Sequence, residues 1–228
     1  MTERTVSAVP LDDGTTTGVS AGLANALAQA RAFGYLGPGP LQTHIDHARG
    51  FFDTLVSAGL SANRQTRFRA VDLGSGGGVP GLLLAEWWPS SLWEIVDSNH
   101  RRMHTLRSVA ADLRMADRLT VHLARAEDAA RDPALRGCCD VVVARGFAGP
   151  GVTAECAAGF LAPGGIFVVS DPPNGADRWS DRGLALLGLR RLAVAPESTY
   201  HFFSAVQDRL TPAKFPRPVG IPGKMPLF

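Results

Sequence analysis

Hydrophobic residues recur near the start of the chain with the spacing of helices. Between 41 and 59, five apolar residues follow one another at intervals of four, three, four and three: Leu41, Ile45, Ala48, Phe52 and Leu55. This spacing is typical of one face of an amphipathic helix, and a second helix is expected over 21–33. The two helices predict an N-terminal helical extension, residues 21–60, that packs on a larger body beside its cleft. His44 and His47 are interpreted as exposed residues of the polar face.

From residue 68 the pattern changes to short apolar runs that alternate with helical segments, which is typical of a parallel sheet. Strands are expected at 68–73, 92–97, 119–123, 140–144 and 165–170, with helices at 80–88, 100–114 and 178–188. Two last strands, 190–195 and 200–208, are joined by residues 196–199. That connection is too short for a helical crossover, so it predicts an antiparallel hairpin. The expected fold is α/β, a mostly parallel seven-stranded sheet with an antiparallel last strand.

The two ends of the chain differ in composition from this body. Residues 1–20 are rich in Thr, Ser, Gly and Asp without any period, which predicts a flexible arm. The main domain is expected over 61–210. Residues 211–228 include prolines at 216, 218, 222 and 226, which argue against a helix and favour an extended tail. The tail either grips an anionic partner through Arg217 and Lys224 or wraps the domain.

The overall composition limits the classes of function. The 228 residues are 45% hydrophobic and 19% charged, with a net charge of only +2, which does not by itself indicate a nucleic-acid binder. No apolar run approaches the ~20 residues of a membrane span, and no secretory signal is evident. A cytoplasmic monomer without a membrane partner is therefore expected. The cysteines, Cys138, Cys139 and Cys156, lack the spacing of metal ligands, so we expect reduced thiols and no metal site.

A glycine-rich turn follows the first expected strand. Gly74, Gly76 and Gly78 permit positive φ and leave room for close approach of a ligand. Pro80 suits the first turn of the next helix, whose free amides are expected to point at that ligand. Two acids frame the turn: Asp72 precedes the first glycine, and Asp97 closes the next strand. The four tryptophans, in contrast, are interpreted as core residues.

The pattern Asp72-x-Gly74-x-Gly76-x-Gly78 resembles motif I of class I S-adenosylmethionine (SAM) methyltransferases, a Rossmann-like fold. A narrower resemblance covers roughly residues 40–228, to the RsmG (GidB) family of 16S rRNA guanine-N7 methyltransferases. It rests on segments 72–81, 96–102, 125–127, 144–148 and 163–165 and on the basic, proline-rich segment 215–227. This resemblance implies a SAM-dependent methyltransferase that acts on 16S rRNA or the 30S subunit.

The resemblance also assigns roles to residues. It implies a cofactor site made of Asp72, Gly74, Ser75, Gly76, Gly78, Pro80, Asp97, Ser98, Ala126, Glu127 and Arg145. Within it, Asp97 would accept hydrogen bonds from the ribose hydroxyls, and Ala126 and Glu127 would lie beside the adenine. Arg145 would be the catalytic residue and would contact the substrate. Arg217 and Lys224 would bind RNA as well.

Two alternatives remain open at this stage. The first is a SAM-dependent methyltransferase of the same ancestry that acts on a small heterocyclic metabolite. The low net charge favours it, as does Asp171, which stands where the family usually carries a lysine and lies in a segment interpreted as a turn, 170–174. The family's N-terminal asparagine-leucine-threonine segment also has no counterpart before residue 40. The second alternative is a non-catalytic binding module.

Overall fold

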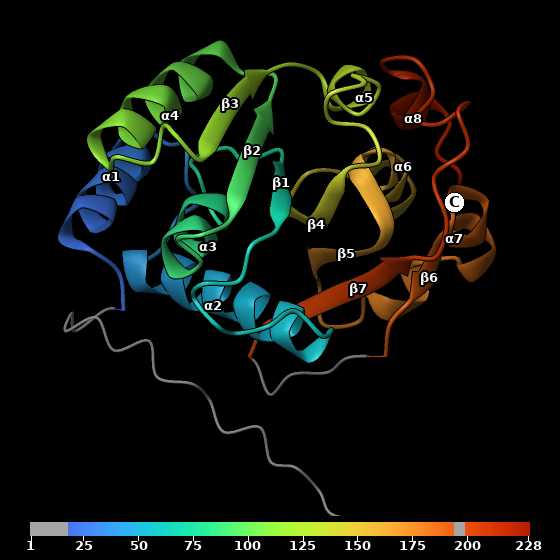
Figure 1. Cartoon of the computed structure of the whole chain (residues 1–228), viewed down its shortest axis with the longest axis horizontal. Coiled ribbons are helices and arrows are strands. Elements are labelled where there is room, and N and C mark those ends of the chain that lie inside the picture. Colours follow the sequence, from blue (N-terminus) through green and yellow to red (C-terminus); the bar gives the residue numbers. More distant parts are fainter. Residues whose placement is uncertain (1–17, 194–198) are drawn as a thin grey trace, which may run out of the picture.

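A seven-stranded sheet runs through the computed structural model, which describes residues 18–193 and 199–228 (Figure 1). The strand order is β3-β2-β1-β4-β5-β7-β6. The strands are β1 Arg69–Leu73, β2 Leu92–Asp97, β3 Leu119–Leu123, β4 Cys139–Ala144, β5 Leu161–Asp171, β6 Leu189–Arg191 and β7 His201–Gln207. The first five are parallel, and β7 is antiparallel to both of its neighbours. The predicted sheet, with its final hairpin, is therefore confirmed.

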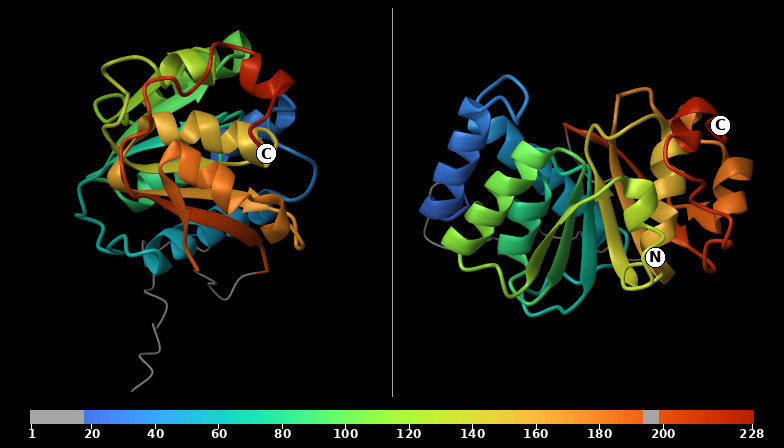
Figure 2. Two further views of the ribbon diagram at one scale, coloured as in Figure 1. Left: turned by 90° about the vertical axis from the view of Figure 1, so that its right-hand side faces the viewer. Right: turned by 90° about the horizontal axis from the view of Figure 1, so that it is seen from above.

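Helices cover both faces of this sheet (Figure 2). They are α1 Ala21–Ala32, α2 Leu41–Ser57, α3 Gly81–Trp87, α4 His100–Asp112, α5 Ala126–Ala129, α6 Pro150–Phe160, α7 Asp181–Leu187 and α8 Ile221–Lys224, with a short 3₁₀ helix at Ala176–Arg178. The residues of α1 to α4 share one hydrophobic cluster with the sheet, and those of α5 to α7 share a second. The sheet thus separates two cores. At its centre β1 lies between β2 and β4, the point at which the strand order reverses and where ligands of such sheets bind.

Helix α2 packs its apolar face on α3, β5 and β7. This confirms the amphipathic helix, but the prediction that His44 and His47 are exposed is wrong. The side chain of His44 is buried, and that of His47 is half-buried against the rings of Tyr200 and Phe202. The reason is that α2 lies across two strands of the sheet, so that more of its circumference is covered than the apolar spacing alone indicates.

Aromatic side chains fill the core beneath α2 and α3. The ring of Phe52 stacks on that of Trp88 with centroids 4.2 Å apart, and Phe68 meets Trp88 edge to face. All four tryptophans are buried, as expected. Each large aromatic side chain removed from water contributes on the order of 2–3 kcal/mol to folding. The central run Val141, Val142 and Val143 of β4 is fully buried, which agrees with a strand covered on both faces.

The tail departs from the extended arm that its prolines predict. Residues 221–224 form one helical turn, α8, with Pro222 in its first turn, where the missing amide hydrogen would have had no partner. The tail therefore includes a helix and lies along α6 (Figure 1). The expected flexible arm, residues 1–20, falls almost wholly outside the described residues. The three cysteines are free thiols, and burial raises the pKa of both Cys139 and Cys156.

Candidate cofactor site

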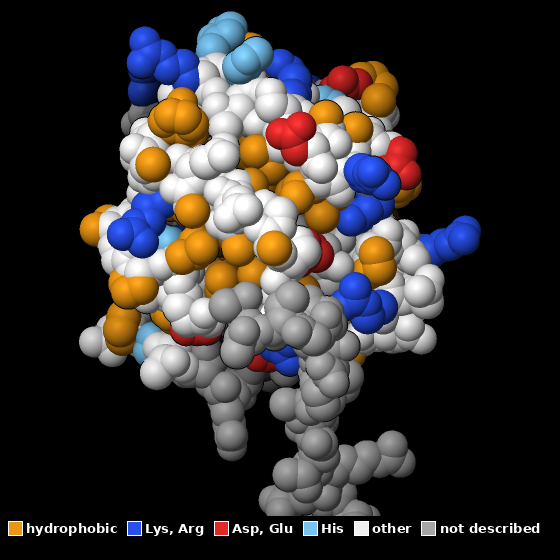
Figure 3. Space-filling model, turned by 90° about the vertical axis from the view of Figure 1, so that its left-hand side faces the viewer, with side chains coloured by type: hydrophobic (Ala, Val, Ile, Leu, Met, Phe, Trp, Pro, Cys, Tyr) orange, Lys and Arg blue, Asp and Glu red, His pale blue; other side chains and the backbone are white. Residues whose placement is uncertain are grey.

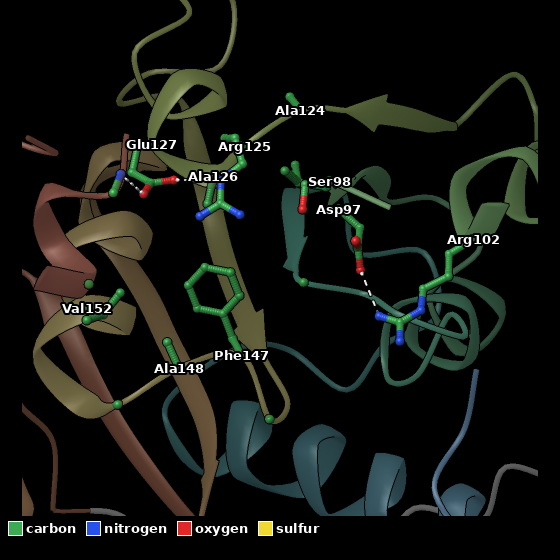
Figure 4. A pocket seen from close by; sticks show the side chains of 16 residues that line it. Asp97, Ser98, Arg102, Ala124, Arg125, Ala126, Glu127, Phe147, Ala148 and Val152 are labelled. Carbon is green, nitrogen blue, oxygen red and sulfur yellow. Dashed lines mark hydrogen bonds and ion pairs between the residues drawn. The ribbon is translucent and has the colours of Figure 1, made fainter. Parts of the chain in front are cut away.

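A cavity of about 500 Å³ opens beside the carboxyl ends of β1, β2 and β4 (Figure 4). Its size lies in the range of small-molecule sites. The residues that line it are Gly74, Val96, Asp97, Ser98, Arg102, Ala124, Arg125, Ala126, Glu127, Gly146, Phe147, Ala148, Gly149, Val152, Gly220 and Gly223. The cavity thus lies at the strand-order reversal, where the glycine-rich turn and the acid at the end of β2 meet.

The glycine-rich turn is built as its sequence predicts. Gly74, Gly76 and Gly78 have φ of 72°, 58° and 90°, which only glycine adopts without strain. A Cβ atom on Gly74 would lie 2.6 Å from Cδ2 of Phe147, so the turn also permits a close approach of that ring. The ring of Phe147 points into the cavity (Figure 4). Glycine at position 74 therefore sets the width of the cavity on this side.

Asp72 lies beneath the turn and is fully buried. Its Oδ2 accepts a hydrogen bond of 2.9 Å from the amide of Gly81, the first residue of α3. The expectation that the amides of this helix start face a ligand is thus wrong for Gly81, because a side chain of the protein already occupies it. The other oxygen, Oδ1, has no hydrogen-bond partner among residues 18–193 and 199–228. Burial raises the pKa of Asp72 to about 6.

Asp97 closes β2 and faces the cavity. Its Oδ2 accepts from the amide of Gly76 at 3.0 Å, and its Oδ1 accepts from the amide of Asn99 at 2.8 Å. Arg102 of α4 approaches Oδ2 to 3.8 Å (Figure 4). These contacts hold the carboxylate at the mouth of the glycine-rich turn. Each oxygen keeps a further lone pair for an incoming hydroxyl group.

Glu127 lies at the opposite side of the cavity, in the short helix α5. Its side chain is nearly inaccessible to solvent, and its Oε1 accepts a hydrogen bond of 3.0 Å from the amide of Gly220 in the tail. Oε2 lies 3.7 Å from Nε of Arg125. One carboxylate oxygen is thus engaged by the tail, and the position of Glu127 beside the adenine stays a prediction. Glu127 binds the tail, and Ala126 contributes the adjoining surface of the cavity.

The structure divides the predicted cofactor residues into two sets. Gly74, Asp97, Ser98, Ala126 and Glu127 line the cavity. Six of the predicted residues do not line it: Asp72, Ser75, Gly76, Gly78, Pro80 and Arg145. Most of them form the turn behind its wall. Pro80, expected in the first turn of α3, instead precedes its first residue. Sequence reasoning gave no cavity role to Arg102, Arg125, Phe147, Gly220 or Gly223.

Arg145 extends from the end of β4 toward α2 rather than into the cavity. Its Nη2 donates a hydrogen bond of 2.8 Å to Nδ1 of His44. Its Nη1 is buried and has no partner within the described part of the chain. Burial lowers the pKa of the guanidinium, and the charge of Asp72 opposes this shift. Arg145 is thus held near Asp72 on the α2 side of the strand ends.

Arg217 and Lys224 are in different situations. The guanidinium of Arg217 binds both oxygens of Glu155, a residue of α6 with a fully buried side chain. Nε and Nη2 of Arg217 are therefore engaged within the chain, and its contact with RNA stays a prediction. Lys224 is exposed on α8.

Asp171 at the end of β5 is also used within the chain. Its carboxylate accepts from Nη1 of Arg178 at 3.3 Å and from Nε1 of Trp179 at 3.0 Å. The turn begins later than expected, because Ser170 and Asp171 belong to β5, and the amide of Gly175 donates to the carbonyl of Pro172.

No cluster of three or more His, Cys, Asp and Glu residues in 18–193 and 199–228 is arranged to hold a metal ion. No helix in the same ranges is both long and apolar enough to cross a membrane.

The side of the molecule formed by α1 and α4 carries Arg and His side chains along its upper edge (Figure 3). Helix α4 begins with a basic sequence that contains His100, Arg101, Arg102, His104 and Arg107. Arg102 belongs at the same time to the cavity wall. A basic surface therefore borders the cavity at this end.

The comparisons with solved structures agree with this fold. The chain is similar to the cofactor-bound protein Rv0187 from MTB, with a TM-score of 0.57 and 22% identity over 86% of this chain and 94% of the other. It is also similar to Aeropyrum pernix fibrillarin with natively bound S-adenosyl-L-methionine, with a TM-score of 0.53 and 19% identity over 71% and 76% of the two chains. At these identities the similarity shows the fold alone, a Rossmann-like methyltransferase fold.

Similarity in sequence is more specific. The family model "rRNA small subunit methyltransferase G" matches residues 46–173. Curated relatives named ribosomal RNA small subunit methyltransferase G include one from Prochlorococcus marinus strain MIT 9313, 36% identical over 72% of this chain and 70% of the relative. Another, from Desulfitobacterium hafniense strain Y51, is 32% identical over 78% and 75%. Since the family model spans more than half of the chain, the chain belongs to the rRNA small subunit methyltransferase G (GidB) family.

Proposed function

We propose that this protein is a SAM-dependent methyltransferase that transfers a methyl group to N7 of a guanine in 16S rRNA, in the cytoplasm. The observation that carries the proposal is the cavity at the ends of β1, β2 and β4, with Asp97 at its mouth, in a chain of the rRNA small subunit methyltransferase G family. Relatives bear that name, and a neighbour of the same fold contains bound S-adenosyl-L-methionine.

The residues present fit this cofactor. Its methionine end is cationic, and the buried Asp72, with an unpartnered Oδ1, supplies negative charge behind the glycine-rich turn. Asp97 would accept hydrogen bonds from the ribose hydroxyls. Ala126 and Ser98 would border the adenosine part, because both line the cavity. When bound, the cofactor supplies an activated methyl group attached to a sulfonium.

The reaction requires little proton transfer by the protein. N7 of guanine has a free lone pair in the neutral base, so no general base is needed. Alignment of the base with the methyl group then supplies most of the acceleration. Arg145 would contribute through its Nη1, which is a donor without a partner in the described structure. A guanidinium at this point can hold guanine O6 or a phosphate beside the reacting nitrogen.

The surface near the cavity agrees with an RNA substrate. Arg125 and Arg102 line the cavity, and Arg101 and Arg107 continue the basic surface along α4. Phosphate contacts by such side chains make binding weaken steeply as salt increases. The low net charge is thus compatible with RNA, because the positive charge is locally concentrated.

The test is transfer of a labelled methyl group from SAM to 30S subunits that lack 7-methylguanosine. We expect labelled 7-methylguanosine in the nuclease digest with the natural protein and a large loss with Arg145→Ala. Arg190→Ala is a suitable control, because Arg190 lies on the edge strand β6 and pairs only at the surface, with Asp208. If a preparation that binds SAM modifies neither 30S subunits nor free 16S rRNA, the RNA assignment is wrong, and a small heterocyclic substrate takes its place.

A further inference from the structure

The C-terminal tail is fastened to the body through a buried ion pair. Glu155 lies in the middle of α6 with a fully inaccessible side chain. Arg217 donates to it from its backbone amide at 2.7 Å and from Nη2 at 2.7 Å. The same guanidinium donates to the carbonyl of Met225 at 2.7 Å, so it also closes the loop between residues 217 and 225. A charge buried this deeply is retained only with such a partner. The tail is therefore packed against the body as an integral part of the fold.

The C-terminal end of the tail, at Phe228, is packed as closely. A Cβ atom on Gly183 of α7 would lie 2.0 Å from Cδ1 of Phe228, and one on Gly151 of α6 would lie 2.6 Å from the carbonyl oxygen of Phe228. Neither glycine has a positive φ, so backbone conformation does not require glycine at these positions. Their absent side chains provide the space that the tail occupies.

Between these two attachments the tail meets the cavity. Gly220 and Gly223 belong to the cavity wall, together with Val152 of α6. The amide of Gly220 donates to Oε1 of Glu127, which fixes this part of the tail against α5. A Cβ atom on Gly223 would meet no atom within 4 Å, so this residue faces open space. The tail thus encloses a cavity that would otherwise be open on this side.

We propose that the turn from Gly220 to Gly223 in the C-terminal tail is part of the cofactor site and forms the wall against the adenine end of SAM. The inference rests on the proposed function and adds to it a set of binding residues that lie outside the methyltransferase sheet. In this arrangement Glu127 acts as a positioning residue. It holds the tail in place, and the tail encloses the cofactor.

The test uses two variants of the full chain, each with one tryptophan, at residue 223 within α8 or at residue 225 directly after it. Gly223→Trp puts an indole where the structure has open space at the cavity wall, without a positive φ to strain the backbone. Met225→Trp is the matched control, because the side chain of Met225 is 66% exposed and outside the cavity. We expect Gly223→Trp to weaken SAM binding in calorimetry by at least about tenfold, and the control to stay within about twofold.

A second measurement needs no variant. Trypsin cleaves after exposed lysines, and Lys224 lies in α8. We expect SAM to slow trypsin cleavage of the bond between Lys224 and Met225 several-fold. Mass spectrometry of the released fragment measures this cleavage. If Gly223→Trp binds SAM as the natural chain does and SAM gives no protection, the inference is overturned while the proposed function stands. If the natural chain does not bind SAM at all, both fail together.

Discussion

Nη2 of Arg145 donates a hydrogen bond to Nδ1 of His44, which joins the end of β4 to a helix 101 residues earlier in the chain. The other ring nitrogen of His44, Nε2, lies 3.1 Å from the carbonyl oxygen of Gly37. A neutral imidazole with its proton on Nε2 satisfies both contacts. Burial, followed by the charge of Arg145, lowers the pKa of His44, which agrees with the neutral form. His44 therefore positions Arg145.

This arrangement predicts the effect of changing His44. His44→Phe removes the acceptor, and we expect methyl transfer to 30S subunits to fall by about tenfold or more. SAM affinity should stay nearly unchanged, because neither residue lines the cavity. His44→Asn, whose amide oxygen takes the place of Nδ1, should restore most of the rate. Equal loss of rate in both variants with a matching fall in melting temperature would indicate a merely structural role.

The buried Asp72 predicts that cofactor binding depends on pH. Its pKa is raised to about 6, so part of the free protein holds a proton there below pH 6. A cationic ligand favours the ionised carboxylate, and binding therefore releases that proton. We expect SAM affinity to rise as the pH increases toward 7 and then to level off, with a difference of roughly threefold to tenfold between pH 5 and pH 7.

Calorimetry in two buffers with different heats of ionisation measures the proton release directly. Asp72→Asn should bind SAM more weakly at pH 7 and should lose most of the pH dependence over this range. An unchanged pH dependence in the variant would assign the effect to another group.

His47 predicts sensitivity of the fold to acid. Burial, followed by the nearby charge of Arg145, lowers its pKa to about 4, whereas the unfolded chain protonates it near pH 6.5. Between these values the unfolded state binds more protons, so the free energy of unfolding decreases as the pH falls from about 6.5 to about 4.

The comparison is with His47→Gln, measured by urea unfolding at several pH values. Relative to the variant, the natural chain should lose on the order of 2–3 kcal/mol across this range. Because Asp72 is present in both chains, its opposite contribution cancels in the difference. Parallel pH profiles would contradict the assignment.

The ion pair between Arg217 and Glu155 predicts a strongly non-additive pair of substitutions. Arg217→Met leaves the carboxylate of Glu155 buried and unpaired, which typically costs about 3–5 kcal/mol. Glu155→Met alone should cost less, because Arg217 is 22% exposed and still reaches a carbonyl oxygen. The double variant should be more stable than Arg217→Met. Denaturant unfolding of the four chains measures the coupling energy, and additive effects would refute the buried-pair interpretation.

Much of the fold follows from local pattern. The period of α2, the apolar runs of β1 to β5 and the hairpin of β6 and β7 were all predictable. Helix α6 was not, because nine of its eleven residues are buried and most of these are small, so no polar face marks a helical period. Helix α8 was missed because Pro222, its one proline, lies in the first turn, where proline is tolerated.

The site residues that lie at the end of a strand were predictable from the sequence. Gly74 and Asp97 are such residues, and both line the cavity. The partners of Glu127 and Arg217 lie 93 and 62 residues away in the chain, and the burial of His44 arises only when α2 packs across β5 and β7. Contacts of this kind depend on tertiary structure, and no spacing in the sequence marks them.

Gly151 and Gly183, which leave room for Phe228, both lie outside the cavity wall. Substitutions that impair methyl transfer are therefore not confined to the residues of the cavity. Gly183 lies in α7 and is not among the residues of the cavity wall. One added methyl group there would collide with the ring of Phe228 and push the tail outward. A genetic screen for loss of methylation should therefore recover alanine at position 183 among its hits, with the sheet intact and every strand-end residue unchanged.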